Sequence, residues 1–181
     1  MALWDASSRS SFLLDPNAAC PLSVDDMVWP SVFERGGVES EAEHDVGINL
    51  PAFIGPHAPF WANLAELEAE ISKHHIDVGV CKIVQVILCS RRVQAAIVQQ
   101  MVHPSFRILG FDVADEMFVS SLTNCGYSAP EEMELRLKYG EHLNEHHLFD
   151  NLKTAVEYCT SSDNLVPEHA PFAPHLLAWR V

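Results

Sequence analysis

The residues that could do chemistry gather first in one stretch, which runs from Phe106 to Tyr127 with the sequence FRILGFDVADEMFVSSLTNCGY. An apolar strand pattern there passes into a segment rich in Asp, Ser, Asn and Cys. Asp112 and Asp115 flank the predicted strand end, where two carboxylates could act as acid and base. They could equally cap backbone N–H groups and bend a loop, or belong to a recognition loop. Cys125 lacks any local signature of a nucleophile, and a turn built on Asn-Cys-Gly explains it as well.

Histidines form the second group of candidate residues. His142 and His146 are four residues apart in GEHLNEHH, a spacing that could bind a divalent metal on a continuous helix. His169, Glu168 or His175 could supply the third ligand. A helix-start signal at Asn144 falls between them, so a solvated helix start explains the same residues. The metal site defines one alternative function, a metal-dependent hydrolase. No other cofactor is expected.

Sequence motifs of the large enzyme classes are absent. The chain contains no GxGxxG, P-loop, HExxH or GxSxG pattern. Nucleotide-binding enzymes and hydrolases with a nucleophile elbow are therefore disfavoured.

Charge gives the strongest statement about partners. The 181 residues hold 25 Asp and Glu against 11 Lys and Arg, a formal net charge of -14. Such a chain repels nucleic acids and anionic membranes and attracts a cationic protein, although the charge could serve solubility alone. The candidate partner surface comprises Asp112, Asp115 and two acidic groups, which are Glu39, Glu41, Glu43 and Asp45, and Glu131, Glu132 and Glu134. The last three also suit the first turn of a helix, where acids favour the dipole.

The expected compartment is the cytoplasm. The start of the chain, MALWDASSRSSFLLD, lacks the basic and long apolar regions of a signal peptide. The five cysteines are odd in number and form no CxxC pair, as in proteins with reduced thiols. The apolar run from Val78 to Cys89 is too short to cross a bilayer.

The elements that must position these residues form a single domain over 1–181. Residues 1–59 carry six prolines and read as an irregular segment wrapping the core, with one short strand at 46–50. The regular part, 60–181, begins with a helix near Trp61 to Ile71. A strand over Val78–Leu88 is apolar on both faces, as in the middle of a sheet. A helix over Arg91–Val102 and strands over Phe106–Phe111 and Met117–Leu122 follow.

The last third of the chain is predicted to be mostly helical. Ser128 and Glu131 fit a capping box that opens a helix over Ala129–Tyr139. A final helix is expected from Asn144 or Glu145, and a last strand over His175–Val181. The order of elements predicts an α/β or α+β fold, a single layered domain with a mixed or antiparallel sheet and about three to four helices.

Three blocks of the sequence carry a family resemblance: GFDVADEMFVSSLTNCGY, LNEHHLFDNLKTAVEY and LVPEHAPFAPHLL. They resemble small bacterial immunity proteins that accompany polymorphic or contact-dependent toxins, over about Phe106 to Leu177. The resemblance implies a cytoplasmic, non-catalytic protein without a cofactor that binds and neutralises one cognate toxin. A basic toxin domain would be steered onto an acidic surface. A non-catalytic adaptor protein is a further alternative.

Overall fold

The computed structural model describes residues 9–15, 61, 63–73, 75, 82–115, 119–122 and 127–181. Within these ranges the chain forms an α+β fold with a four-stranded antiparallel sheet, four α-helices and a short 3₁₀ helix. In chain order the elements are β1 (Arg9–Asp15), α3 (Leu64–Lys73), β2 (Lys82–Leu88), α4 (Ala95–Met101), β3 (Phe106–Ala114), α5 (Ala129–Tyr139), η3 (Gly140–His142), α6 (Leu152–Leu165) and β4 (Ala173–Arg180).

The sheet has the strand order β1-β2-β4-β3, and every neighbouring pair is antiparallel. The last strand of the chain is therefore inserted between two earlier ones. The five residues from Ile83 to Ile87 are all buried in β2, which confirms the prediction of a strand in the middle of the sheet. The antiparallel pairing also decides between the mixed and antiparallel sheets that the sequence left open.

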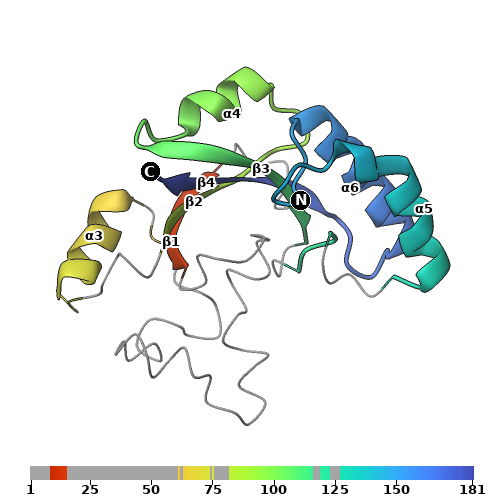
Figure 1. Ribbon diagram of the computed structural model, residues 1–181, viewed down its shortest axis with the longest axis horizontal. Coiled ribbons are helices and arrows are strands. Elements are labelled where there is room, and N and C mark those ends of the chain that lie inside the picture. Colours follow the sequence, from red (N-terminus) through yellow and green to blue (C-terminus); the bar gives the residue numbers. More distant parts are fainter. Residues whose placement is uncertain are drawn as a thin grey trace, which may run out of the picture.

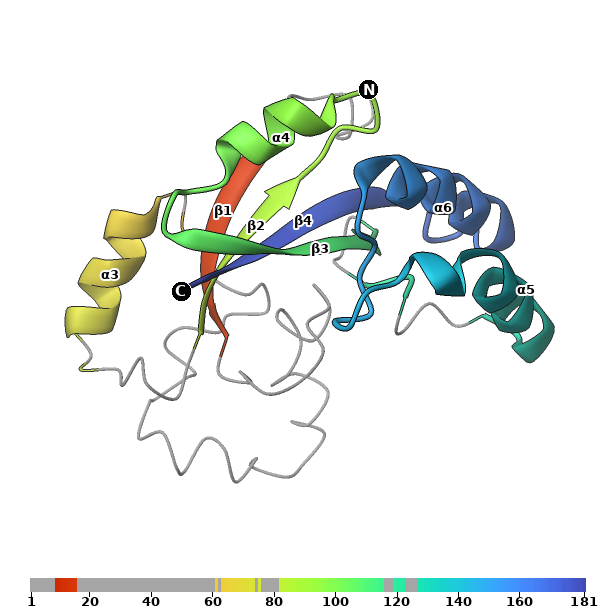
Figure 2. The same ribbon diagram turned by 45° about the horizontal axis from the view of Figure 1, so that its top comes forward.

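The helices lie on one face and at the two sides of the sheet (Figure 1). Figure 2 shows α4 lying across the strands, with α3 on one side and α5 and α6 together on the other. The buried side chain of Gln85 in β2 makes two hydrogen bonds to the end of α4. Its Nε2 donates to the Met101 carbonyl and its Oε1 accepts from the His103 N–H, each at 2.9 Å.

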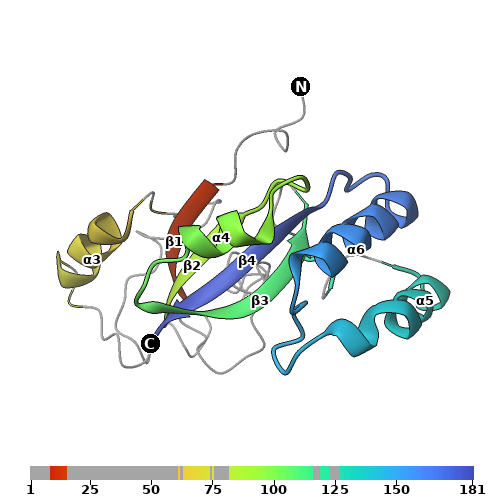
Figure 3. The same ribbon diagram turned by 90° about the horizontal axis from the view of Figure 1, so that it is seen from above.

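Aromatic side chains hold α5 against α6. The rings of Tyr139 and Tyr158 meet edge to face with centroids 5.1 Å apart, and Phe149 contacts both. The Tyr139 hydroxyl also lies 2.8 Å from the Ser161 Oγ. The helix pair is thus one packed unit, with α5 as its outer member (Figure 3).

An arginine clamp joins three segments that are distant in sequence. Arg91, just after β2, makes two hydrogen bonds of 2.6 and 2.9 Å to the carboxylate of Asp163 in α6. Its Nε donates to the Phe172 carbonyl at 2.8 Å, and Asp163 accepts from the Phe172 N–H. This bidentate geometry is the strong form of an arginine–carboxylate pair and fixes the end of α6 against the start of β4.

Two regions differ from the prediction in whether they contain a strand. The stretch 1–59, expected to be irregular outside 46–50, contains the edge strand β1, whose Phe12 is part of the core. The predicted strand at 46–50 lies outside the described residues. Of Met117–Leu122, the described residues 119–122 form one bridge, between Ser120 and Ala114, and a turn rather than a strand. The expectation of a single domain over 1–181 stays a prediction.

The predicted start of the last helix was wrong. Asn144 shapes a turn, because its Oδ1 accepts from the backbone N–H groups of His146 and Leu148 and its Nδ2 donates to the Leu109 carbonyl. The helix begins at Leu152, and its cap is Asn151, whose Oδ1 accepts from the Thr154 N–H at 2.9 Å. Asn serves both as a helix cap and as a turn residue, and the local sequence did not separate the two roles.

Candidate functional site

The polar residues of the Phe106–Tyr127 stretch are brought together at the end of β3, beneath α6. We call this group the buried polar cluster; it comprises Asp112, Asp115, Ser120, Ser121, Ser162, His169 and His175. Six of the seven are buried, and only His169 is partly exposed. The residues come from β3, the turn after it, α6, the following loop and β4. The fold thus brings together residues whose positions span more than 60 residues of the sequence.

Asp112 stabilises the turn that follows β3. Its Oδ1 accepts from the Ser120 Oγ and from the Val113 N–H, each at 2.7 Å. It is fully buried and lies opposite His175 in the register of β3 and β4. Carboxylates that accept local N–H and O–H groups in this way shape backbone rather than face a partner.

Asp115 holds a histidine from a distant loop. Its Oδ1 accepts from the Val119 N–H, and its Oδ2 lies 2.9 Å from the Nδ1 of His169. Because a carboxylate accepts, His169 donates from Nδ1, and in a neutral ring Nε2 is then the acceptor. This is the arrangement of an oriented base. The hydroxyls of Ser120 and Ser121 bond elsewhere, so within the described ranges no nucleophile is seen to meet that nitrogen.

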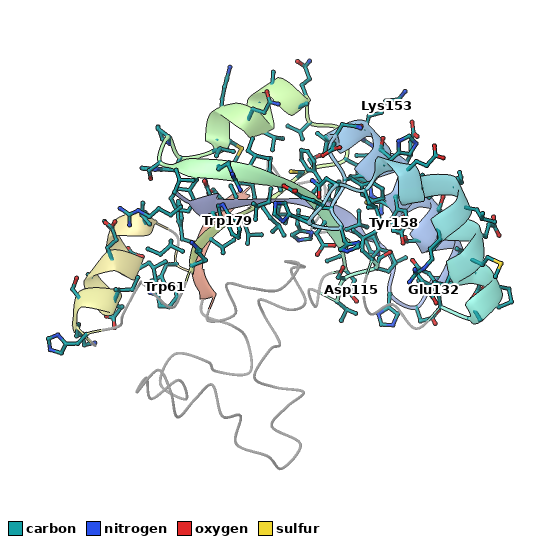
Figure 4. The ribbon with its side chains drawn as sticks, viewed as in Figure 1. Trp61, Asp115, Glu132, Lys153, Tyr158 and Trp179 are labelled. Carbon is teal, nitrogen blue, oxygen red and sulfur yellow. The ribbon has the colours of Figure 1, made fainter. Side chains whose placement is uncertain are left out.

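Serine and tyrosine hydroxyls join the turn to α6. The Ser121 Oγ lies 2.8 Å from both the Tyr127 hydroxyl and the Ser162 Oγ. The Tyr158 hydroxyl donates to the Ser121 carbonyl at 3.0 Å. Figure 4 shows Tyr158 between the helices and the sheet and Asp115 near the sheet end. The network gives the buried hydroxyls hydrogen-bond partners and holds the turn after β3 rigidly against α6.

His175, like Asp112, is fully buried. Burial lowers its pKa to about 4, while its bond to the Ala173 carbonyl and the charge of Asp115 act in the opposite direction. Its Nδ1 lies 3.0 Å from that carbonyl and therefore carries the proton of the neutral ring. His175 is neutral at pH 7 and contributes no charge to the cluster.

The described cysteines do not act as nucleophiles. Cys89 and Cys159 are buried, and desolvation raises the pKa of each thiol to about 12, so both stay protonated. Both pack as small residues of the hydrophobic core. Cys125 and Cys81 lie outside the described residues.

His142, His146 and His169, which were proposed as metal ligands, lie in different settings. His142 ends η3, whereas His146 lies in the loop before α6, so the two do not share a continuous helix. His146 packs edge-on against Trp179, and His169 donates to Asp115. Within the part of the chain that the structure describes, no group of three His, Cys, Asp or Glu side chains could hold a metal ion.

The carboxylates proposed for a partner surface divide into three sets. Asp112 and Asp115 are 0% and 3% exposed, so including them in an outer surface was wrong. The reason is that both are consumed by the turn and loop contacts described above. The acidic group Glu39, Glu41, Glu43 and Asp45 lies outside the described residues.

The third set lies on α5, as predicted. Glu131 reaches back to the N–H and Oγ of Ser128 at 2.8 and 2.6 Å, which confirms its reach-back bond in the capping box. These bonds lower the pKa of Glu131. Glu132 and Glu134 are exposed, and Glu132 pairs with Arg136 one turn later at 2.6 Å. Only Glu132 and Glu134 are therefore available to a partner without undoing a cap.

Sequence reasoning missed two residues beside these glutamates. Met133 and Leu137 are 64% and 81% exposed, while Leu135 and Tyr139 of the same helix are buried. The helix therefore presents an apolar pair on the side opposite its core contacts. The signal was present in the sequence, because positions 133 and 137 fall about 200° from 135 and 139 on a helix with about 100° per residue.

No known protein family, curated protein or solved structure matches this chain. Within the described residues, no helix has the length and apolar character needed to cross a membrane. A function therefore has to be inferred from the chain's own residues.

Proposed function

We propose that the chain is an immunity-type protein that binds a cognate toxin domain in the cytoplasm and neutralises it through an acidic surface. The observation that carries the proposal is the charge of the helical layer formed by α5, η3 and α6. From Ser128 to Glu168 this layer and its loops hold nine Asp and Glu against three Lys and Arg.

The three basic residues of this layer offset only part of its negative charge, and two of them are paired with carboxylates. Arg136 pairs with Glu132, Lys153 lies 3.7 Å from Glu157, and Lys138 lies over the ring of Tyr139. Glu134 and Glu145 are exposed on the same layer. A surface of this kind raises the rate of association with a basic protein and repels nucleic acid.

The proposal is tested by affinity capture, with the full chain as bait in a lysate of the cells it comes from. The expected result is one basic protein, recovered in 1:1 complex and released as salt rises, because salt screens surface charges. Replacing Glu132 and Glu134 together by Gln should slow association about tenfold at low salt. Association that is indifferent to salt and to both substitutions would count against an acidic docking surface.

One observation favours an enzyme as a second candidate: the bond between Asp115 and the partly exposed His169. An enzyme of the hydrolase class would lose its activity when His169 is replaced by Ala, whereas neutralisation of a toxin would survive. A non-catalytic adaptor would instead recover a partner that is harmless to cells. The toxicity of the recovered partner and the effect of the His169 substitution therefore distinguish the three functions.

A further inference from the structure

Two cationic side chains meet at one tryptophan of the sheet. The Lys82 Nζ lies 5.4 Å from the centroid of the Trp179 ring, and the Arg107 Cζ lies 5.6 Å from it. Trp179 belongs to β4, which lies between β2 with Lys82 and β3 with Arg107. Arg107 is opposite Trp179 in the register, and Lys82 is two residues from Val84, which is opposite it on the other side. The two cations therefore reach the indole from the strands on both sides of β4.

This group lies on the face of the sheet that points away from α4. The side chain of Gln85 points towards α4, because it donates to the Met101 carbonyl at 2.9 Å. Successive residues of a strand point to opposite faces, so Val84 and its partner Trp179 point the other way. Figure 4 shows Trp179 on the sheet between α3 and α6. Trp179 is partly exposed, so a ligand can reach it from solvent.

Lys82 and Arg107 lack the carboxylate partners that other cations of the chain have. Five other Lys and Arg side chains of the described residues pair with carboxylates at 2.6 to 3.7 Å: Lys73, Arg91, Arg136, Lys153 and Arg180. Among the described residues, Lys82 and Arg107 form no such pair and contact the indole instead. Arg107 is exposed and Lys82 partly exposed. Stacking on an aromatic ring leaves their positive charge unneutralised, so both can still bind an anion.

Two acidic residues bear on the charge of this group. His146 packs edge-on against Trp179, and the Glu145 Oε1 lies 3.7 Å from the His146 Nε2. The side chain of Glu145 is 86% exposed, so solvent screens its charge. In the register of β1 and β2, Asp15 is opposite Lys82. A carboxylate at that position competes with a bound anion for Lys82, which makes Asp15 a useful site for a test.

The spacing of the two cations favours a ligand with two anionic groups. Neighbouring strands lie about 4.8 Å apart, so β2 and β3 are about 10 Å apart on either side of β4. Lys82 and Arg107 each stack on the indole from their own strand, which keeps their charges apart. A diphosphate offers one phosphate group to each cation, and the planar guanidinium of arginine matches the oxygens of a phosphate.

Charge also limits the size of the ligand. The chain has a net charge of -14, which repels polyanions such as nucleic acids, anionic membranes and acidic proteins. A small ligand carries few negative charges and approaches one cationic site without meeting the rest of the acidic surface. A small anion is therefore favoured over a macromolecule.

We propose that Lys82, Arg107 and Trp179 form a binding site for a small ligand that carries a diphosphate group. Lys82 and Arg107 each bind one phosphate, and the indole of Trp179 holds the two cations in place. The site lies on the sheet, whereas the proposed partner surface lies on the layer of α5, η3 and α6. The inference is therefore independent of the proposed function.

The experiment titrates the full chain with inorganic pyrophosphate at pH 7 and low salt, in a buffer without phosphate. Calorimetry should show one site per chain, with orthophosphate bound at least about tenfold more weakly because it meets one cation at a time. In an NMR spectrum of the nitrogen-labelled chain, the indole N–H signal of Trp179 should shift on binding. Trp179→Phe identifies this signal among the four tryptophans.

Substitutions of the two cations test their roles. Lys82→Gln and Arg107→Gln should each weaken pyrophosphate binding about tenfold, since each removes a charged hydrogen-bond donor. The matched control is Lys138→Gln, which removes a cation that lies 4.8 Å from the Tyr139 ring but has Glu134 and Glu157 near it. The control should bind like the wild type.

Asp15→Asn tests the site in the opposite direction. Pyrophosphate binding should become about threefold tighter when the competing carboxylate opposite Lys82 is removed. Unchanged or weaker binding in this variant would count against Lys82 as a phosphate ligand.

The remaining outcomes decide separate points. Weaker binding in Lys82→Gln and Arg107→Gln, with Lys138→Gln unchanged, supports the inference. Equal weakening in all three variants would show a general effect of net charge and overturn the site. Orthophosphate that binds as tightly as pyrophosphate overturns a ligand with two anionic groups. A wild-type chain that gives neither heat nor a shift of the Trp179 signal overturns the inference without the need for any variant to fold, and leaves the proposed function standing.

Discussion

The buried polar cluster and the outer face of α5 distribute polarity in opposite ways. In the cluster, Asp112, Asp115 and the serines lie inside the fold and bond to one another or to backbone. On α5, two large apolar side chains face solvent while their core-facing neighbours are buried. Side chains whose types suggest chemistry therefore serve structure here, whereas two large apolar side chains of α5 are accessible to solvent.

The difference shows what each region can tolerate. A buried polar network stabilises a fold only when every member has a partner, so loss of one member is costly. An exposed apolar pair contributes little to folding and can be replaced at small cost. The comparison therefore predicts large stability effects near the cluster and small ones on α5, with the order reversed for partner binding.

The largest stability effect is expected at Gly110, in β3 close to the cluster. Its φ of 150° is a region that other residues rarely adopt, and an added Cβ would lie 2.7 Å from the Leu148 Cβ and 2.9 Å from the Phe149 carbonyl oxygen. Gly110→Ala should lower the free energy of unfolding by about 3 kcal/mol or more, measured by urea denaturation.

Gly140 supplies the matched control for that substitution. Its φ is -58°, and a Cβ there meets nothing within 4 Å. Gly140→Ala should leave stability unchanged or raise it by up to about 1 kcal/mol. Equal effects at the two glycines would show that the fit of β3 against the 144–149 loop is not as tight as the structure has it.

The next largest effect on stability is expected when the pH is lowered. The pKa of His175 is about 4 in the folded chain, against the ordinary histidine value of 6.5 that applies to the unfolded chain. The unfolded chain binds more protons between these values, so stability is full above pH 6.5 and falls as pH drops toward 4. This residue alone should cost about 3 kcal/mol across that window.

Two measurements check the effect of His175. Denaturation at pH 7, 5.5 and 4 should show a steeper fall for the wild type than for His175→Gln. Should that variant fail to fold, NMR titration of the histidine ring protons in the wild type gives the answer directly. A His175 ring that takes up its proton near pH 6.5 in the folded chain would contradict its burial.

The smallest stability effect is expected on the outer face of α5. Met133→Gln with Leu137→Gln should change the free energy of unfolding by less than about 0.5 kcal/mol, since both side chains are exposed. Leu135→Ala on the inner face should cost about 2 kcal/mol or more, because it opens a cavity. A large loss from the outer pair would mean that another part of the chain covers it.

The sequence predicted the central strand β2 and the helix α5 better than the edge strand β1. The runs of Val and Ile in β2 and the capping box at Ser128 are local signals, and the structure bears out both the central strand and the helix Ala129–Tyr139. The edge strand β1 was missed because its pairing with β2 joins residues about 70 positions apart. Pairing at that distance leaves no local signature.

The site was harder to predict than the fold. The burial of Asp115 depends partly on His169, which is 54 residues away, so local sequence suggested an exposed recognition loop. Predicting that Met133 and Leu137 are exposed required knowing which side of α5 faces the core. Helical spacing could have supplied that once Leu135 and Tyr139 were taken as the inner pair.

The measurement that tests the central claim most directly is growth of cells that express the captured partner's toxic domain with and without this chain. We predict that the domain alone stops growth, that the wild-type chain restores it, and that Glu132→Gln with Glu134→Gln restores it less well. A captured partner that never impairs growth, or toxicity that the wild-type chain leaves unchanged, would contradict the proposed function.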